Sequence, residues 1–391
     1  MRIAILPGRA DLRFEHDIWT GGSDIERWTG AQESDTKTNQ IATRMQSAHV
    51  KLTSWRGRTA NMTKLGVAVV GSGIYGEVHA RTYSKHPEVE LLRVWSRSEE
   101  RAKKVADKFG CKWSTRFDDV LKDDRIQLVS VATPDHAHTD YALAALKAGK
   151  HVLLEKPMAQ TTKECKAILS ARDASGAKLM VNYHNRWYPA FLAARDAIAA
   201  GKIGKPVCAN FVLSDTISWV EGNMTWAEHS GPEWFLMSHI ADLAFWMLND
   251  RPEEVYAMAS EGLLSSRGFK TKDVVKATMQ MKKGAIVHFE STWVLCRNWR
   301  NPVNDMWLSV QGETGRIDVL ADYENITITS DKYQTPFVML NVTEEPPIID
   351  FVDCVREDKP SPVTGEEGML ATQAIEAVVE SYKSNKVVKL S

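Results

Sequence analysis

The chain of 391 residues is long for one domain, and its 43% hydrophobic and 25% charged residues are the proportions of a globular protein with two cores. A formal net charge of -1 removes the electrostatic argument for a nucleic-acid partner, and no apolar run approaches the ~20 residues that span a membrane. The five cysteines are scattered and odd in number, which argues against a disulfide framework or a structural zinc site and predicts a cytoplasmic protein.

The first 62 residues are predicted to be an N-terminal extension that is largely disordered. They carry clusters of Gly, Ser, Thr and Asn and show no sustained apolar period. The short apolar run Ile3–Leu6 stops at Pro7, which makes it too brief for the core of a secretory signal. Met62 stands where the folded part is expected to begin.

Residues 63–184 alternate between strand and helix patterns. Buried strands are predicted at 65–70, 91–96, 128–132, 152–154 and 179–182, and helices at 75–85, 99–109, 137–148 and 162–175. Gly110 and Gly149 supply stop signals, and Asp135 is a candidate cap for the helix at 137–148. Such alternation implies right-handed crossovers and a doubly wound parallel sheet in an α/β domain.

Residues 185–391 change rhythm and predict an α+β domain with a large, open-faced, mostly antiparallel sheet. Helices are expected near 191–200, 234–248, 348–356 and 368–383, the last two as candidates to pack back on the first domain. Strands are expected at 255–260, 274–281, 285–294, 306–311, 316–319 and 326–329. Most of the 13 tryptophans lie here, as core residues or as stacking walls for a sugar-like ligand.

The strongest local signal is a glycine-rich turn that follows the first strand and opens a helix. The first glycine permits the turn, the second admits a pyrophosphate, and the third allows close packing of helix on strand. The context predicts a dinucleotide-binding Rossmann domain. Its cofactor-binding residues would be Gly71, Ser72, Gly73, Ile74, Tyr75 and Gly76.

The end of the second strand bears on the choice of cofactor. An NAD site usually presents an acidic residue about 20 residues beyond the glycine-rich turn. Here the chain reads Ser96-Arg97, a hydroxyl and a cation that suit a 2′-phosphate. NADP is therefore the predicted cofactor, with NAD as the alternative if Ser96 and Arg97 are only a solvated strand end.

Two further segments fall at carboxyl ends of predicted strands, where open α/β sheets bind their ligands. The first carries Thr133, Pro134 and His138, and no cysteine or carboxylate cluster turns its histidines into a metal site, so no metal is predicted. The second is Glu155-Lys156-Pro157. A lysine at the mouth of a cofactor cleft can stabilise a developing alkoxide, although a lone lysine at a strand end is usually a solvated charge.

These motifs, together with Asn185-Arg186-Trp187-Tyr188-Pro189, resemble the Gfo/Idh/MocA family, which includes glucose–fructose oxidoreductase and inositol dehydrogenases. The resemblance runs from about residue 63 to 391. It implies oxidation or reduction of a sugar, cyclitol or related polyol and assembly as a homodimer or homotetramer. It also implies that Lys156 polarises the reacting oxygen and that Glu155 and Arg186 lie near the nicotinamide. The residues implied to line the cofactor cleft are Thr133, Pro134 and His138.

The family's second catalytic signature, an acidic residue four positions before a histidine, is altered here. His239 matches the family histidine, but Phe235 occupies the acidic position, so an i, i+4 arrangement would set His239 against an aromatic ring. His239 could act alone as general acid/base, or Glu233, Glu228 or His229 could assist it. A buried helix histidine without chemical function is the competing interpretation.

The first functional hypothesis is therefore an NADP-preferring dehydrogenase or reductase acting on a CH–OH group of a carbohydrate-like substrate, with Lys156 and His239 as catalytic residues. The alternative is a non-catalytic regulatory protein of the same fold that binds dinucleotide and sugar. Phe235 keeps the alternative open, whereas the intact Glu155-Lys156-Pro157 weighs against it.

Overall fold

The computed structural model describes residues 63–321, 325–330, 338–339 and 344–390, which belong to one unit, Thr59–Ser391. The N-terminal extension, 1–62, and the expectation of disorder attached to it lie outside the described residues. Within the described ranges, no helix is long and apolar enough to cross a membrane.

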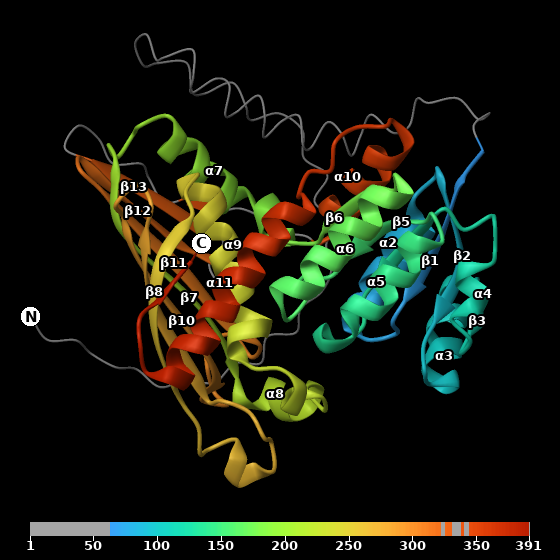
Figure 1. Ribbon diagram of the computed structural model, residues 1–391, viewed down its shortest axis with the longest axis horizontal. Coiled ribbons are helices and arrows are strands. Elements are labelled where there is room, and N and C mark those ends of the chain that lie inside the picture. The colour runs from blue at the N-terminus through green and yellow to red at the C-terminus, as the bar shows by residue number, and fades with distance from the viewer. Residues whose placement is uncertain (1–62, 322–324, 331–337, 340–343, 391) are drawn as a thin grey trace, which may run out of the picture. The chain divides into compact units, whose positions relative to one another are not determined.

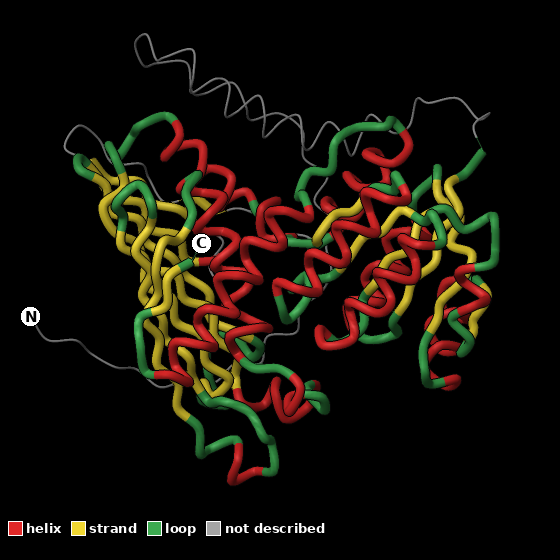
Figure 2. Tube along the Cα trace, viewed as in Figure 1, coloured by secondary structure: helices red, strands yellow, loops and turns green. Residues whose placement is uncertain are grey.

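A six-stranded sheet with the order β3-β2-β1-β4-β5-β6 forms the first half of the described chain, and all its paired strands run parallel (Figures 1 and 2). Its first strand is buried at every position, as the apolar run Leu65–Val70 predicts. The expected doubly wound Rossmann sheet is confirmed. Its strands are β1 Leu65–Val70, β2 Val89–Trp95, β3 Lys112–Ser114, β4 Leu128–Val131, β5 His151–Leu154 and β6 Leu179–Val181.

The helices that connect these strands are α2 Ile74–Lys85, α3 Glu99–Phe109, α4 Asp118–Leu121, α5 His138–Lys147 and α6 Thr162–Ser175. The stop signal at Gly110 is confirmed, because this residue is left-handed at the end of α3. The proposed cap at Asp135 is wrong, because a 3-10 turn, η2 Asp135–Ala137, separates it from α5. Its carboxylate instead accepts hydrogen bonds from the His136 backbone N–H and the Ser230 hydroxyl.

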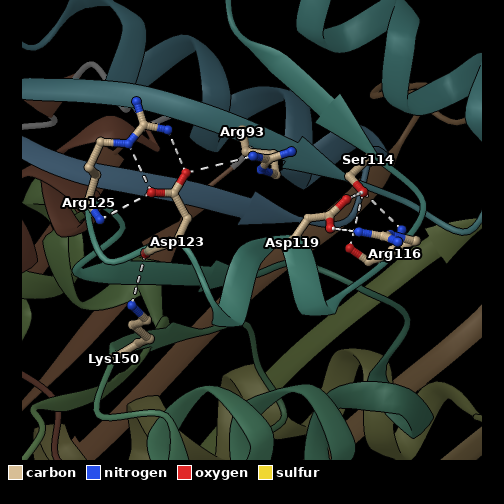
Figure 3. Close-up of polar contacts among 7 residues, drawn as sticks. All are labelled: Arg93, Ser114, Arg116, Asp119, Asp123, Arg125 and Lys150. Carbon is tan, nitrogen blue, oxygen red and sulfur yellow. Dashed lines mark hydrogen bonds and ion pairs between the residues drawn. The ribbon is translucent and has the colours of Figure 1, made fainter.

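An ion-pair network lies at the amino ends of β4 and β5, away from their carboxyl ends (Figure 3). Asp123 lies 2.6 Å from Arg125 and 3.7 Å from Arg93, and its carbonyl accepts a hydrogen bond from Lys150 at 3.1 Å. The hydrogen bond from Arg125 lowers the pKa of Asp123 to about 2. The network joins the loops that precede β4 and β5 to β2.

A second sheet of nine strands has the order β14-β13-β12-β11-β7-β10-β9-β8-β15. Its paired strands are antiparallel apart from β7 and β10, which run parallel. The mostly antiparallel sheet is confirmed, although its central strand β7 and the short edge strands were not predicted. The strands are β7 Pro206–Thr216, β8 Pro252–Ser260, β9 Val274–Met281, β10 Ile286–Leu295, β11 Asn304–Gly312, β12 Gly315–Leu320, β13 Asn325–Ser330, β14 Val338–Met339 and β15 Val388–Lys389.

The remaining helices cover this sheet and link it to the first one (Figure 1). The helix α11 packs on both α6 and β8, and the Thr162 hydroxyl on α6 donates to Glu376 on α11. Apolar residues of α10, such as Phe351, complete the core of the parallel sheet. These helices and turns are η3 His184–Trp187, α7 Pro189–Ala199, α8 Ile217–Asn223, η4 Ala227–His229, η5 Glu233–Met237, α9 Ser238–Leu248, η6 Ser265–Arg267, α10 Glu345–Arg356 and α11 Gly365–Ser384.

Candidate active site

A cleft of about 610 Å³ runs along the carboxyl ends of the parallel strands. It begins at the glycine-rich turn and ends where Lys156 meets Trp219 and Phe235 of the second half of the chain. Eleven of the predicted cofactor-site residues line it: Gly71, Ser72, Gly73, Ile74, Tyr75, Ser96, Arg97, Thr133, Pro134, Glu155 and Lys156.

The glycine-rich turn fits a dinucleotide pyrophosphate. Gly71 has a φ of 119°, and a Cβ there would lie 2.2 Å from the Ala132 carbonyl oxygen. A Cβ on Gly73 would meet no atom within 4 Å, so the backbone faces open space at the start of α2. Gly76 does not line the cleft, but a Cβ there would lie 2.2 Å from the Gly71 oxygen. The three glycines thus occupy the positions that a phosphate-binding turn requires.

The part of the cleft beside the end of β2 is aromatic and basic. Trp95 and Tyr141 form its wall, with ring centroids 4.7 Å apart. Arg97 and Arg101 line it from the end of β2 and the start of α3, and both side chains are exposed. Cationic side chains that lack a buried partner remain able to bind an anionic group such as a 2′-phosphate.

Glu155 is fixed by a buried network within the Rossmann domain. Its Oε1 accepts hydrogen bonds from His79 Nε2 at 2.9 Å and from Asn182 Nδ2 at 2.6 Å. Burial alone would raise the pKa of Glu155, but these contacts hold it down at about 2. The carboxylate is therefore ionised and fully engaged, which suits a residue that positions its neighbour Lys156 rather than one that exchanges protons. His79 and Asn182 were not predicted as site residues, because nothing in their local sequence patterns indicates this contact.

Lys156 carries the cation at the end of the cleft. Its side chain is 4% exposed, and Nζ donates to the Phe235 carbonyl at 2.8 Å and lies 4.0 Å from the centre of the Phe235 ring. Burial lowers the pKa of Lys156 to about 8, although Glu155, Asp135 and Asp215 oppose the shift. The lysine is an ammonium at neutral pH, held in a buried position rather than solvated.

A second cavity of about 280 Å³ adjoins the cleft and shares Tyr75, Trp219 and Phe235 with it. This substrate-sized space is near the lower limit, about 300 Å³, of known small-molecule sites. Its lining is rich in hydrogen-bonding groups. The polar and aromatic members besides the shared ones are His184, Asn185, Tyr188, Asp215, His239, Asn301, Asn304 and Glu344.

His239 lines this second cavity as a neutral imidazole. The amide Nδ2 of Asn185 lies 3.4 Å from His239 Nδ1, and the ring of His184 packs edge-on at 5.0 Å between centroids. Burial, and then the charge of Lys156, lower the pKa of His239 well below its usual range. Because Nδ1 accepts from Asn185, the neutral ring keeps its proton on Nε2.

The helix that carries His239 begins with a π turn, η5, and this turn alters the predicted geometry. Phe235 packs on Trp226 and Trp293, with centroids 5.7 and 6.1 Å apart, while the ring beside His239 is His184. The prediction that His239 contacts the Phe235 ring is therefore wrong, because residues four positions apart do not share a face through a π turn. Of the three proposed helpers, Glu233 accepts from Tyr382, Glu228 lies 3.7 Å from His229, and His229 packs on His136 in the lining of the cleft.

Besides Gly76, two predicted cofactor residues, Arg186 and His138, are absent from the cleft lining. Arg186 forms a buried salt bridge with Asp242 and a second with Glu367, so its guanidinium joins η3 to α9 and α11. The nitrogens of His138 lie 2.7 Å from the Pro157 carbonyl and 2.9 Å from the Thr133 carbonyl. These contacts hold the two side chains behind the walls of the site, and their role in cofactor binding stays a prediction.

Comparison with known proteins identifies the family. The oxidoreductase family with an NAD-binding Rossmann fold matches residues 65–183, and the GFO/IDH/MocA C-terminal domain matches residues 191–318. Levoglucosan dehydrogenase, solved with NADH and levoglucosan, superposes with a TM-score of 0.75 at 21% identity, covering 84% of this chain and 99% of that one. The myo-inositol 2-dehydrogenase of Lactobacillus plantarum gives a TM-score of 0.74 at 21% identity, with 84% and 100% covered.

Relatives in sequence carry related names. The NADP(+) scyllo-inositol 2-dehydrogenase of Bacillus subtilis is 26% identical over 87% of this chain and 99% of its own length. The inositol 2-dehydrogenase of Rubrobacter xylanophilus is 30% identical, but the match spans 49% of this chain and 57% of that protein. With two other relatives the match spans 62% and 52% of their length. The two family matches together cover more than half of the chain, which therefore belongs to the Gfo/Idh/MocA family of oxidoreductases.

Proposed function

We propose that this protein is an NADP-preferring dehydrogenase or reductase that acts on a CH–OH group of a sugar, cyclitol or related polyol, or on the matching keto compound. The observation that carries the proposal is the buried ammonium of Lys156, which lies where the dinucleotide cleft meets a polar cavity of about 280 Å³. The names of the relatives, inositol and levoglucosan dehydrogenases among them, support the substrate class.

The side chains around this junction fit that chemistry. A bound nicotinamide cofactor supplies the hydride acceptor or donor. Lys156, held by the Phe235 carbonyl, can donate a hydrogen bond to the reacting oxygen and stabilise negative charge there. His239 can donate from Nε2 to a second oxygen of the substrate. The aromatic side chains of Tyr75 and Trp219, which line both cavities, place apolar surface beside the region where hydride would pass.

The test is turnover with NADP(H) and NAD(H) against a panel of sugars, cyclitols and their keto forms, followed by absorbance of the reduced nicotinamide. We expect hydride transfer with at least one cyclic polyol or keto compound. Tight binding of cofactor and sugar with no transfer to any member of the panel would favour the alternative, a non-catalytic regulatory protein of this fold.

Cofactor choice provides a separate prediction. Ser96 and Arg97 line the cleft at the end of β2, so we expect NADPH to bind more tightly than NADH. The double variant Ser96→Asp/Arg97→Ala should narrow or reverse this preference, because a lost charge-assisted phosphate contact costs about 1.5–3 kcal/mol, or roughly tenfold or more in Kd. Fluorescence titration with both cofactors measures the change.

The control is Lys103→Ala, which removes an exposed cation on α3 outside the cleft lining and should leave both affinities unchanged. Tighter binding of NADH than of NADPH by the wild-type protein would contradict the preference. Assembly as a homodimer or homotetramer and a cytoplasmic location stay predictions of the sequence.

A further inference from the structure

Asp215 is a buried carboxylate that neither the family signature nor the sequence pattern indicated. It is the penultimate residue of β7, the strand between β10 and β11, and its side chain lines the same cavity as His239. The residue is 3% exposed, and its Oδ2 makes no hydrogen bond of normal geometry among the described residues, although the side chain of Trp293 lies close enough to its carboxyl group to lower the pKa. A buried carboxylate oxygen without a partner costs folding free energy, so its position at a cavity points to a ligand that completes it.

The surroundings of Asp215 suit a proton acceptor. Burial raises the pKa of Asp215 to about 7, and the ammonium of Lys156 and the side chain of Trp293 limit this rise. Its carboxyl group can therefore exchange a proton near neutral pH, as a general acid/base must. Lys156 responds to Asp215 in turn, since the carboxylate opposes the fall in the lysine pKa. The charges of the two groups therefore interact, although Lys156 lines the cleft and Asp215 lines the cavity.

His239 does not fill this role in its observed state. Its Nδ1 accepts a hydrogen bond from Asn185, so the neutral ring offers the cavity an N–H donor and no free lone pair. Its pKa lies well below the usual range because the ring is buried. Among the described residues that line the cavity, His239 therefore offers an N–H donor and Asp215 offers a carboxylate oxygen, while His184 and Glu344 line it as well.

We propose that Asp215 is the catalytic acid/base of this site. It would take the role of the acidic residue that the family signature has at the position of Phe235. This inference rests on the proposed function. In the oxidation direction, the carbinol C–H bond breaks and its electron pair passes with the hydrogen to the oxidised nicotinamide. The O–H bond also breaks, its proton goes to Asp215 Oδ2, and the C=O bond forms. Reduction of a keto compound runs the same transfers backwards.

The experiment compares Asp215→Asn with Asp305→Asn in the full-length protein. Asp305 is a matched control, because it is a buried carboxylate on the adjacent strand β11, pairs with Arg300 at 2.7 Å and lies outside the cavity lining. We expect Asp215→Asn to lower kcat about 10²-fold and to keep NADPH affinity within a few-fold, whereas Asp305→Asn retains the wild-type kcat.

The dependence of kcat/KM on pH gives a second test, because a purely structural role of Asp215 would not change it. The titratable groups that line the cavity besides Asp215 are Tyr75, His184, Tyr188, His239 and Glu344, and Lys156 lines the adjoining cleft. If Asp215 must be ionised to accept the proton, kcat/KM for oxidation falls as pH drops below about 7. This acid limb should disappear in Asp215→Asn and persist in Asp305→Asn.

Thermal stability separates a catalytic from a structural carboxylate. The folded-state pKa of Asp215 lies above the ~3.9 of an unfolded aspartate, so its ionisation destabilises the fold as pH rises. Asp215→Asn should therefore have the same Tm as wild type or a higher one at pH 8. A lower Tm, or a kcat that matches wild type, overturns the role of Asp215 and leaves the proposed function standing. A wild-type protein that turns over no member of the panel overturns both.

Discussion

Lys156→Ala is expected to lower turnover by about 10²–10⁴-fold, the usual contribution of a group that stabilises charge or moves a proton at the reacting oxygen. The expectation follows from the position of Lys156 after β5, at the junction of the two cavities, with Nζ 2.8 Å from the Phe235 carbonyl. NADPH affinity should stay within a few-fold, because the glycine-rich turn follows a different strand, β1. Steady-state kinetics and fluorescence titration measure the two effects separately.

Lys150→Ala is the matched control. Lys150 is also buried in the Rossmann domain, but it precedes β5 and donates to the Asp123 carbonyl at the opposite end of the strand (Figure 3). We expect this variant to keep the wild-type kcat. Equal losses in the two variants, or a tenfold loss of NADPH affinity in Lys156→Ala, would show that the lysine supports the fold rather than the reaction.

The pH dependence of the reduction direction follows from the same residue. Burial lowers the pKa of Lys156 to about 8, so the ammonium is present below this pH and is lost above it. Because the ammonium is the hydrogen-bond donor to the carbonyl oxygen, kcat/KM for reduction should fall as pH rises through about 8. Lys156→Ala should lose the contribution of Lys156 to this basic limb, whereas the contribution from loss of the Asp215 proton, at about pH 7 in the wild type, should remain.

Where an element depends on local chemistry, the sequence predicted it closely. The strand Leu65–Val70 and the helices Glu99–Phe109 and Thr162–Ser175 have the predicted bounds. The strand is a continuous apolar run, and each helix begins at a hydroxyl side chain that accepts a backbone N–H and ends at a left-handed glycine. Such signals operate within a few residues and need no tertiary context.

The central strand β7 was missed because its sequence changes character along its length. Its first half is partly exposed and its second half is buried, so neither alternation nor a continuous apolar run extends over the strand. Ser214, Asp215 and Thr216 are buried polar residues that a sequence pattern assigns to a turn. Since the strand was not predicted, Asp215 could not be placed in the cavity.

The π turn at Glu233–Met237 likewise prevented a correct prediction of the side chains that surround His239. One turn with i, i+5 spacing does not disturb a 3.6-residue period enough to be detected, but it changes which side chains share a face. Phe235 therefore packs over Lys156 instead of His239. The error concerned geometry alone, since both residues do line the predicted site.

Arg186→Met is expected to destabilise the protein by about 3–5 kcal/mol, because it leaves a buried carboxylate without its partner. Arg186 is 6% exposed, and its Nε and Nη2 donate to the two oxygens of Asp242 at 2.8 and 2.5 Å. Its Nη1 donates to Glu367 at 2.6 Å, at the start of α11. Urea denaturation at pH 8 measures the loss, and the exposed pair Arg316–Asp318 gives a control, since Arg316→Ala should cost less than about 1 kcal/mol.

The loss in free energy of unfolding that Arg186→Met causes should become smaller as the pH falls. Burial already raises the pKa of Asp242, and loss of the Arg186 cation removes the interaction that opposes this rise. In the variant, the folded-state pKa of Asp242 then lies further above the ~3.9 of an unfolded aspartate, so protonation relieves the buried charge and restores stability at pH 5 relative to pH 8. A deficit that is the same at both pH values would contradict the ion pair. The NADPH affinity of the folded variant should match that of the wild type. Weaker NADPH binding would support the predicted role of Arg186 in the cofactor site.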